Sequence, residues 1–263
     1  MVSNEILFIP CQWKEIHALV EKDIRTNNVT IESFWEEHVL ESTHYKMMFQ
    51  NEIVGYFAVH KGKTLVLFHV SDTFANQSQK LFAEVKKYEN VTNAMVPTGN
   101  EFFLSHCIDN FSRIEKQAYF SIYTEKEISP EQQKPLKLRL ADVNKDYDAL
   151  KLSGDFLDGE IEKLHKGNDY LNIYIAEYNG NIVGFGVIEY GRVLSDIASI
   201  GMYVCDQYRR QGIGANILQQ LKHICQENGC RAFSGCWYYN HNSKKSMESA
   251  GAYSKTRLIR FYF

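Results

Sequence analysis

The segment 204–218 has the residue types and spacing that point most directly to chemistry. Arg209, Gly212 and Gly214 fit the pattern R-x-x-G-x-G. Apolar residues then recur at helical spacing until Asn228-Gly229, a typical helix end. The pattern predicts a turn that opens a helix, where backbone N–H groups lack intrahelical partners and glycines let a ligand approach. Such a turn suits the pyrophosphate of an anionic cofactor.

Two other phosphate-binding patterns do not fit this segment. A Walker loop needs Gly-Lys-Ser/Thr after its first glycine, and a dinucleotide-binding turn needs G-x-G-x-x-G near the start of a βαβ unit. Glycine-rich turns also occur before helices where they only relieve crowding, so the neighbouring elements must decide between these interpretations.

Strands are expected on both sides of the turn. Residues 173–178 and 182–189 alternate as a hairpin around Asn179-Gly180-Asn181, and 197–204 is the next strand. A further strand, Ala232–Tyr239, follows the helix.

This order of elements resembles the GNAT superfamily of acyl-coenzyme A-dependent N-acyltransferases. The segment 240–252 is similar to the family pattern N-x-x-[AS]-x-x-x-Y-E-x-x-G-[FY], and it departs from that pattern at two places. Met247 replaces the usual tyrosine, and Ala252 replaces the usual aromatic residue. The resemblance covers about 137–263.

The resemblance implies that acetyl-coenzyme A is a cosubstrate. Its pyrophosphate would meet the turn, and its pantetheine arm would lie along the end of the preceding strand. A backbone N–H at Met202 or its neighbour would hold the oxygen of the tetrahedral intermediate. The implied cofactor-binding residues are Met202, Tyr203, Val204, Arg209, Arg210, Gln211, Gly212, Ile213, Gly214, Ala215, Asn240 and Ser243.

The general base of the family has no direct match. Many GNAT enzymes carry a glutamate six residues before the valine that corresponds to Val204, where this chain has Ala198. The nearest carboxylates are Asp196, on the same strand face, and Glu189, at the end of the adjacent strand. Each of these two carboxylates also fits an ordinary solvent-exposed side chain that has no catalytic role.

The proton donor to the leaving thiolate is also displaced, because a methionine cannot donate a proton. Tyr203, Tyr238 and Tyr239 are alternatives, and each also fits ordinary aromatic packing. Trp237 fits either packing or the wall of a cleft. The candidate catalytic residues are therefore Asp196, Glu189, Tyr203 and Tyr239.

An internal repeat is the second large signal. The segments 51–59, 70–74 and Asn100 in the first half are matched in the second half by 180–188, 204–208 and Asn240. Chance similarity between amphipathic strands is the alternative. The first half has neither glycine nor arginine at 75–80, so only the second half is expected to bind the cofactor.

The expected fold class is α+β, with two tandem GNAT-like domains, each a mixed, mainly antiparallel twisted sheet flanked by helices. Residues 125–135 are charged and polar and hold two of the four prolines, which is typical of a linker. The expected division is a degenerate GNAT-like domain at 1–128, a linker at 129–136 and a GNAT acetyltransferase domain at 137–263.

Composition excludes several classes of partner. The net charge is −3 and no polybasic run occurs, so no nucleic acid is expected. The start 1–10 lacks a basic leader and no long apolar run occurs, so we expect a cytoplasmic protein without a membrane partner. No histidine pair has metal-binding spacing, and the six cysteines form no C-x-x-C pair, so we expect no metal and reduced thiols. A homodimer is compatible with the sequence.

The sequence therefore predicts an N-acetyltransferase that moves an acetyl group to a primary amine by direct attack on the thioester. The acceptor is a small molecule or a peptide, and the sequence does not identify it. The alternative is a GNAT module that binds or senses coenzyme A without turnover, which is consistent with Ala198 and Met247.

Overall fold

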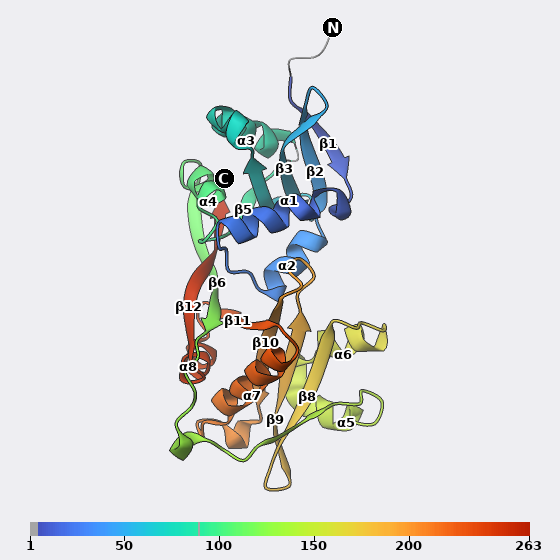
Figure 1. Cartoon of the computed structure of the whole chain (residues 1–263), viewed down its shortest axis with the longest axis vertical. Coiled ribbons are helices and arrows are strands. Elements are labelled where there is room, and N and C mark those ends of the chain that lie inside the picture. The colour runs from blue at the N-terminus through green and yellow to red at the C-terminus, as the bar shows by residue number, and fades with distance from the viewer. Residues whose placement is uncertain (1–4, 89) are drawn as a thin grey trace. The chain divides into compact units, whose positions relative to one another are not determined.

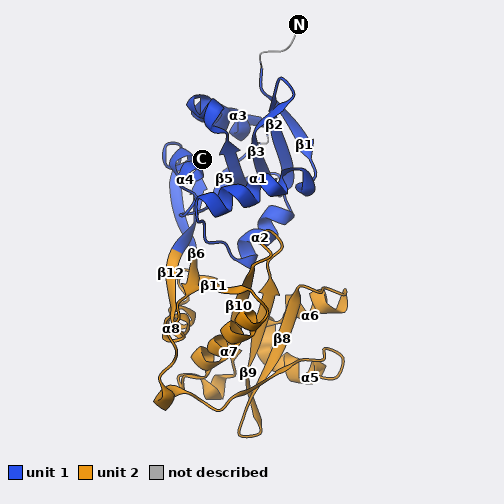
Figure 2. Ribbon diagram, viewed as in Figure 1, with its two compact units in different colours: residues 1–118, 256–263 blue, residues 119–255 orange. Residues whose placement is uncertain are grey.

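The computed structural model describes residues 5–88 and 90–263, which form two compact units (Figures 1 and 2). Unit 1 comprises residues 1–118 and 256–263, and unit 2 comprises residues 119–255. The first four residues of the start segment considered above lie outside the described part. Both units contain a mixed, mainly antiparallel sheet with helices beside it, which confirms the predicted fold class.

Unit 1 begins with an antiparallel meander of four strands, and a fifth strand is parallel to the fourth. The strands, in spatial order, are β1 (Leu7–Cys11), β2 (Thr43–Phe49), β3 (Glu52–His60), β4 (Thr64–Val70) and β5 (Asn93–Pro97). The helices and the 3₁₀ turn are α1 (Trp13–Thr26), α2 (Ser33–Leu40), η1 (Asp72–Gln77), α3 (Ser78–Tyr88) and α4 (Glu101–Ile108).

Unit 2 repeats this plan. Its strands are β7 (Lys137–Leu140), β8 (Leu171–Tyr178), β9 (Asn181–Tyr190), β10 (Ile197–Val204) and β11 (Arg231–Trp237), in that spatial order. Its helices and 3₁₀ turns are η2 (Pro130–Gln132), α5 (Tyr147–Leu150), η3 (Lys151–Phe156), α6 (Asp158–His165), η4 (Asp206–Tyr208), α7 (Ile213–Glu227) and α8 (His241–Ser249). No helix in the described ranges combines the length and apolar character needed to cross a bilayer.

Two long strands, β6 (Arg113–Tyr123) and β12 (Ala252–Tyr262), contribute residues to both units. The end of β12 belongs to unit 1 because residues 258–262 pair antiparallel with residues 93–97 of β5. The units therefore divide the chain differently from the predicted domains: the boundary lies after Ala118, and the last eight residues, 256–263, return to the first unit.

The local predictions around the glycine-rich turn agree with the structure. The hairpin β8–β9 turns at Asn179 and Gly180, whose φ angles of 50° and 77° are those a tight hairpin turn needs. The strand expected at 197–204 is β10. The strand after the helix ends at Trp237, earlier than predicted, because the Asn240 N–H donates to the Trp237 carbonyl (2.9 Å) and closes a turn.

Two apolar clusters cover opposite faces of the unit 2 sheet. On one face, which we name the α7 face, Ile217 and Leu221 of α7 pack with Ala198 and Ile200 of β10. On the other, the α6 face, side chains of α5 and α6 pack with β8 and β9, including Phe185. The six cysteines are free in the structure.

The two units share one element order, which supports the predicted repeat. In both, a glycine faces the end of the strand before the turn. A Cβ at Gly55 would clash with the His69 carbonyl oxygen, and a Cβ at Gly184 would clash with that of Tyr203. Only glycine allows this close backbone approach, so the same residue is required at the same place in each unit.

The segment predicted as a linker packs on unit 2. We name residues 124–136 the strap. The Lys134 N–H donates to Asn216 Oδ1 (2.8 Å) and the Ile128 N–H to Gln219 Oε1 (3.0 Å), while Ile128 and Leu136 are buried. Because side chains of α7 satisfy its backbone, the strap is an ordered part of unit 2 rather than a free connection.

Candidate active site

The strands β10 and β11 form a fork. They are paired in parallel at only three positions, of which Ser199 with Phe233 is the last. At the branch point the Ser234 hydroxyl donates to the Ile200 carbonyl (2.7 Å), and the Tyr123 hydroxyl lies 2.8 Å from Ser234 Oγ. Burial raises the pKa of Tyr123, so this phenol stays protonated. Beyond the branch point the β10 residues 201–204 are half-buried.

Backbone groups of β10 point into this fork. The Cys205 N–H donates to the Val183 carbonyl (3.0 Å) and the Ile197 carbonyl accepts from Gly191 (2.9 Å), so the odd-numbered residues of β10 face β9. Orientation alternates along a strand. The N–H groups of Met202 and Val204 therefore face the side from which β11 has separated, where the sequence predicted a pantetheine arm.

The turn after β10 presents backbone N–H groups. Arg210 (φ 60°) and Gly212 (φ 78°) are both left-handed, and Gly212 is the N-cap of α7. The N–H groups of residues 213–215 have no acceptor among the residues that the structure describes. A left-handed turn followed by a helix start is a favourable concavity for an anion.

Side chains around the turn mostly stabilise it. Arg209 donates from Nε to the Val204 carbonyl (3.1 Å) and pairs with Asp206 (2.7 Å). A Cβ at Gly214 would lie 3.0 Å from Met202 Sδ, so this glycine lets α7 approach β10. Ile213 and Ala215 are buried, whereas Gln211 is exposed. The backbone, rather than these side chains, is what a ligand would meet.

The helix α8 begins beside the turn. Asn240 caps it by accepting from the Ser243 N–H (3.1 Å). Ser246 of the same helix lies close to Gly214, since a Cβ there would be 3.4 Å from its hydroxyl. Met247 is 3% exposed and belongs to the cluster of the α7 face, so it packs where the family has a proton donor.

Of the two predicted carboxylates, only Glu189 lies near the fork. It is directly opposite Ser199 in the β9–β10 pair and alternates with Phe185 and Val187 of the α6 face. Its side chain is 11% exposed, and Oε1 lies 3.6 Å from Arg192 Nη2.

Asp196 precedes β10 and pairs with Arg231 (3.1 Å) at the closed end of the fork. At about 3.3 Å per residue, it lies about 20 Å along the strand from Met202. The structure therefore does not bring Asp196 to the fork. The position of the usual glutamate, Ala198, is fully buried on the α7 face.

The predicted tyrosines differ in their surroundings. Tyr203 lies on the α6 face of β10, with its ring 5.7 Å from that of Phe156 and 5.6 Å from the Arg209 guanidinium. Tyr239 is 51% exposed. Tyr238 stacks on Tyr119 at 4.5 Å and 13°, which is aromatic packing.

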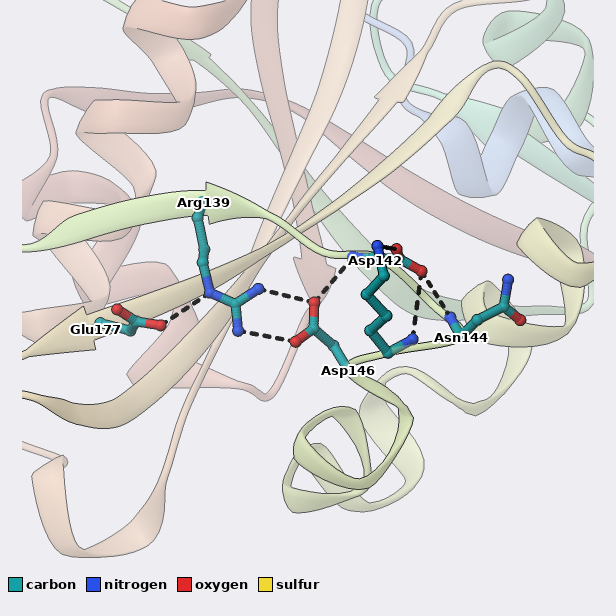
Figure 3. A network of polar contacts seen from close by, with 6 residues as sticks. Arg139, Asp142, Asn144, Asp146 and Glu177 are labelled. Atoms are coloured by element: carbon teal, nitrogen blue, oxygen red, sulfur yellow. Dashed lines mark hydrogen bonds and ion pairs between the residues drawn. The ribbon is translucent and has the colours of Figure 1, made fainter.

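An ion-pair network holds the elements of the α6 face to the edge of the sheet (Figure 3). Arg139 on β7 donates to both oxygens of Asp146 (2.7 and 2.9 Å) and to Glu177 on β8 (2.9 Å). Asp146 is the N-cap of α5 and also accepts from the Asp142 N–H. The network thus anchors the segment that leads through α5 and η3 to Phe156.

Sequence reasoning missed Ser234, Tyr123 and Phe156. Ser234 and Tyr123 act at the branch point of two strands, and Phe156 lies 3.8 Å from where a Cβ of Gly201 would be. No motif marks them, because their roles depend on strand register and on a contact from a distant turn.

The corresponding fork of unit 1 leads into a different helix start. The strands β4 and β5 are paired at only two positions, but η1 runs directly into α3, and the Ser78 N–H donates to the Ala75 carbonyl. The Ser78 hydroxyl lies 2.9 Å from His106 Nε2. The rings of Phe68, Phe102 and His106 pack together at 4.5–6.0 Å. No left-handed residue opens this helix.

Two family models match the chain. The first, described as an acetyltransferase (GNAT) domain, matches residues 12–124, and the second, described as the acetyltransferase (GNAT) family, matches residues 122–252. No curated protein sequence matches it.

Solved structures share this fold at low sequence identity. An acetyltransferase from the GNAT family of Colwellia psychrerythraea is 17% identical, with a TM-score of 0.84 and coverage of 98% of this chain and 99% of that one. A GCN5-related N-acetyltransferase from Sphaerobacter thermophilus is 14% identical (TM-score 0.65, coverage 100% and 97%). A tandem GNAT protein from the clavulanic acid biosynthesis pathway is 11% identical (TM-score 0.65, coverage 98% of each chain).

Proposed function

The chain belongs to the GNAT acetyltransferase family, with two GNAT domains in tandem, and we propose that unit 2 transfers an acetyl group from acetyl-coenzyme A to a primary amine. The acceptor is a small molecule or a peptide. The observation that carries this proposal is the fork that leads into the left-handed turn at Arg210 and Gly212, with backbone N–H groups available along both.

The residues present fit the substrate that the family implies. The N–H groups of residues 213–215 would hold the pyrophosphate, and the β10 backbone from Met202 to Val204 would bind the pantetheine arm. The Met202 N–H points into the fork and would donate to the developing oxyanion. Gly214 supports this arrangement, because any side chain there would push against Met202.

Glu189 is the base that the geometry favours. It lies on the α6 face at the branch point, opposite Ser199 and about 10 Å along the strand from Met202, where it would accept the proton of the attacking amine through bridging water. Tyr203, on the same face and nearer the turn, has a phenol that would donate to the leaving thiolate. This arrangement replaces the two family positions held here by Ala198 and Met247.

Coenzyme A release tests the proposal. The full chain is incubated with acetyl-coenzyme A and a panel of primary amines, and free thiol is measured. We expect turnover with at least one amine, and Glu189→Gln should reduce kcat by about 10²- to 10⁴-fold. Glu227→Gln, an exposed carboxylate at the end of α7, is the control. A loss caused by Asp196→Asn instead would show that the base is assigned wrongly.

The second candidate is a module that binds coenzyme A without turnover. Its supporting observation is that Ala198 and Met247, at 0% and 3% exposure, put no acid or base at the two usual positions. Tight binding of coenzyme A, with no thiol released in the presence of any amine, would favour this candidate.

A further inference from the structure

A polar cavity lies in unit 2 between the strap and α7. Its volume is about 190 Å³, enough for several water molecules or for a small ligand. Both elements contribute to its lining, and every lining side chain carries a polar group. The lining residues are Gln133, Lys134, Asn216, Gln219, Gln220 and His223. None of them belongs to the fork between β10 and β11.

The α7 side of the cavity is one face of the helix. Its four residues there follow one another at intervals of three or four, and such residues lie on the same side of a helix. Leu221, between them in sequence, packs instead with the cluster of the α7 face. The cavity therefore lies on the side of α7 that points away from the sheet.

Asn216 places the cavity beside the start of α7. Its Nδ2 donates to the carbonyl of Gly212, the N-cap (3.0 Å), and to the Gln132 carbonyl (3.1 Å). Its Oδ1 accepts from the Lys134 N–H (2.8 Å). Because Asn216 is four residues after the N-cap, the cavity begins about one helical turn beyond the left-handed turn.

Two donors in the lining have no acceptor among the residues that the structure describes. Gln219 is 6% exposed, and its Oε1 accepts from the Ile128 N–H, but its Nε2 has no protein partner. The Lys134 ammonium forms no ion pair with any described carboxylate. Leaving a buried amide donor unsatisfied is costly, so a ligand that accepts from Gln219 would be stabilised there.

The charge of the lining favours an anion. Lys134 is cationic, and none of the six lining residues is acidic. The carboxylate of Glu127 is outside the lining and is held by Lys222 (2.7 Å) and by Nε2 of His223 (3.2 Å). A phosphate monoester suits these donors, because it carries up to two negative charges and three strong acceptor oxygens.

We propose that this cavity binds a phosphate monoester or free phosphate, with Lys134 as the charged donor and the Gln219 amide as the second donor. Two sources have this chemistry. The 3′-phosphate of coenzyme A is one ribose away from the pyrophosphate, which would lie at the neighbouring turn, and this source rests on the proposed function. A free phosphate ion or phosphorylated metabolite is the other source, and it does not depend on that function.

The test titrates the full chain with acetyl-coenzyme A and with its 3′-dephospho analogue, which lacks only the monoester. Lys134→Gln removes the charge but keeps the backbone N–H that binds Asn216. Calorimetry should show that it weakens the binding of acetyl-coenzyme A by at least about tenfold, the value of one charge-assisted hydrogen bond, and leaves the affinity for the analogue unchanged. Lys137→Gln, an exposed lysine of β7 outside the lining, is the control.

Inorganic phosphate tests the second source. It is added to the chain saturated with the dephospho analogue, so that the turn is already occupied. Phosphate binding that Lys134→Gln weakens about tenfold would support the cavity as its site. Such binding together with equal affinities for the two cofactor forms would identify free phosphate, rather than coenzyme A, as the source.

The outcomes separate the cavity from the proposed function. If neither cofactor form binds, but phosphate added alone binds and Lys134→Gln weakens it, the cavity proposal stands and the cofactor assignment of unit 2 is wrong. If both cofactor forms bind equally well to wild type and to Lys134→Gln, and phosphate does not bind, the cofactor assignment stands and the cavity proposal is wrong. An equal loss of affinity in Lys137→Gln would also overturn the cavity proposal.

Discussion

Asn100 and Asn240 cap equivalent helices in the two units. The Asn100 Oδ1 accepts from the Phe103 N–H and the Asn240 Oδ1 from the Ser243 N–H, each at 3.1 Å. The same cap thus has different surroundings in the two units: in unit 1 the rings of Phe102 and His106 pack at 4.5 Å, whereas in unit 2 the helix follows the strand β11, which separates from β10 beyond Phe233.

This pair of residues separates structural effects from effects on binding. Asn100→Ala and Asn240→Ala should each lower the free energy of unfolding by about 1 kcal/mol, because each removes a helix cap. Only Asn240→Ala should weaken the binding of acetyl-coenzyme A. Chemical denaturation and calorimetry measure the two quantities, and equal losses of affinity in both variants would contradict the assignment.

Substitutions of two glycines, one at each end of α7, test whether the turn is the pyrophosphate site. Gly212 and Gly229 have φ angles of 78° and 74°, so a valine is strained to a similar extent at either position. Gly212→Val should abolish binding of acetyl-coenzyme A because its side chain blocks the N–H groups. Gly229→Val should lower the free energy of unfolding without changing the affinity for acetyl-coenzyme A. If Gly212→Val binds like the wild type, the turn is not the pyrophosphate site.

The strap depends on Lys222, which is 2% exposed and whose Nζ lies 2.7 Å from Glu127 Oε1. Lys222→Met should lower the free energy of unfolding by about 1–2 kcal/mol, since the strap loses this pair and the bond to the Thr124 carbonyl. Lys166→Met, which breaks an exposed pair with Glu162, should cost less than about 0.5 kcal/mol. Equal losses in the two variants would contradict the anchoring role of Lys222.

The ion pair between Lys222 and Glu127 also makes the stability of the protein depend on pH. Burial alone would raise the pKa of Glu127, but hydrogen bonds from Lys222 and His223 lower it overall. A carboxylate whose pKa is lowered on folding contributes stability above its unfolded pKa, and this contribution is lost as the pH falls through the folded value. The difference between wild type and Lys222→Met, measured by denaturant unfolding, should therefore shrink as the solution is acidified below about pH 4. A difference that stays constant into this range would contradict the linkage.

The Arg139 network should matter for both stability and acceptor binding. Arg139→Lys keeps the charge but loses the two parallel bonds to Asp146, so we expect a loss of about 1 kcal/mol. It should also raise KM for the amine, because the segment leading to Phe156 loosens. Arg113→Lys, in an exposed pair at 3.9 Å, is the control. An unchanged KM would show that the network does not position the acceptor side.

Sequence reasoning succeeded where the signals are local. Asn179-Gly180 marks the hairpin, and the apolar spacing after Gly212 ends at Gly229, as the structure has it. It failed where distant segments meet. The return of residues 256–263 to unit 1 depends on pairing with β5, and the strap depends on polar side chains of α7. Likewise, spacing put Asp196 on the face of Ala198 but could not show which end of β10 opens into the fork.

The most direct test of the central claim is the stoichiometry of acetyl-coenzyme A binding to the full chain, measured by calorimetry. We predict one site per chain, located in unit 2 and lost in Gly212→Val, because the helix start of unit 1 is closed by η1 and by the contact between Ser78 and His106. Two equivalent sites, or one site that persists in Gly212→Val, would contradict it.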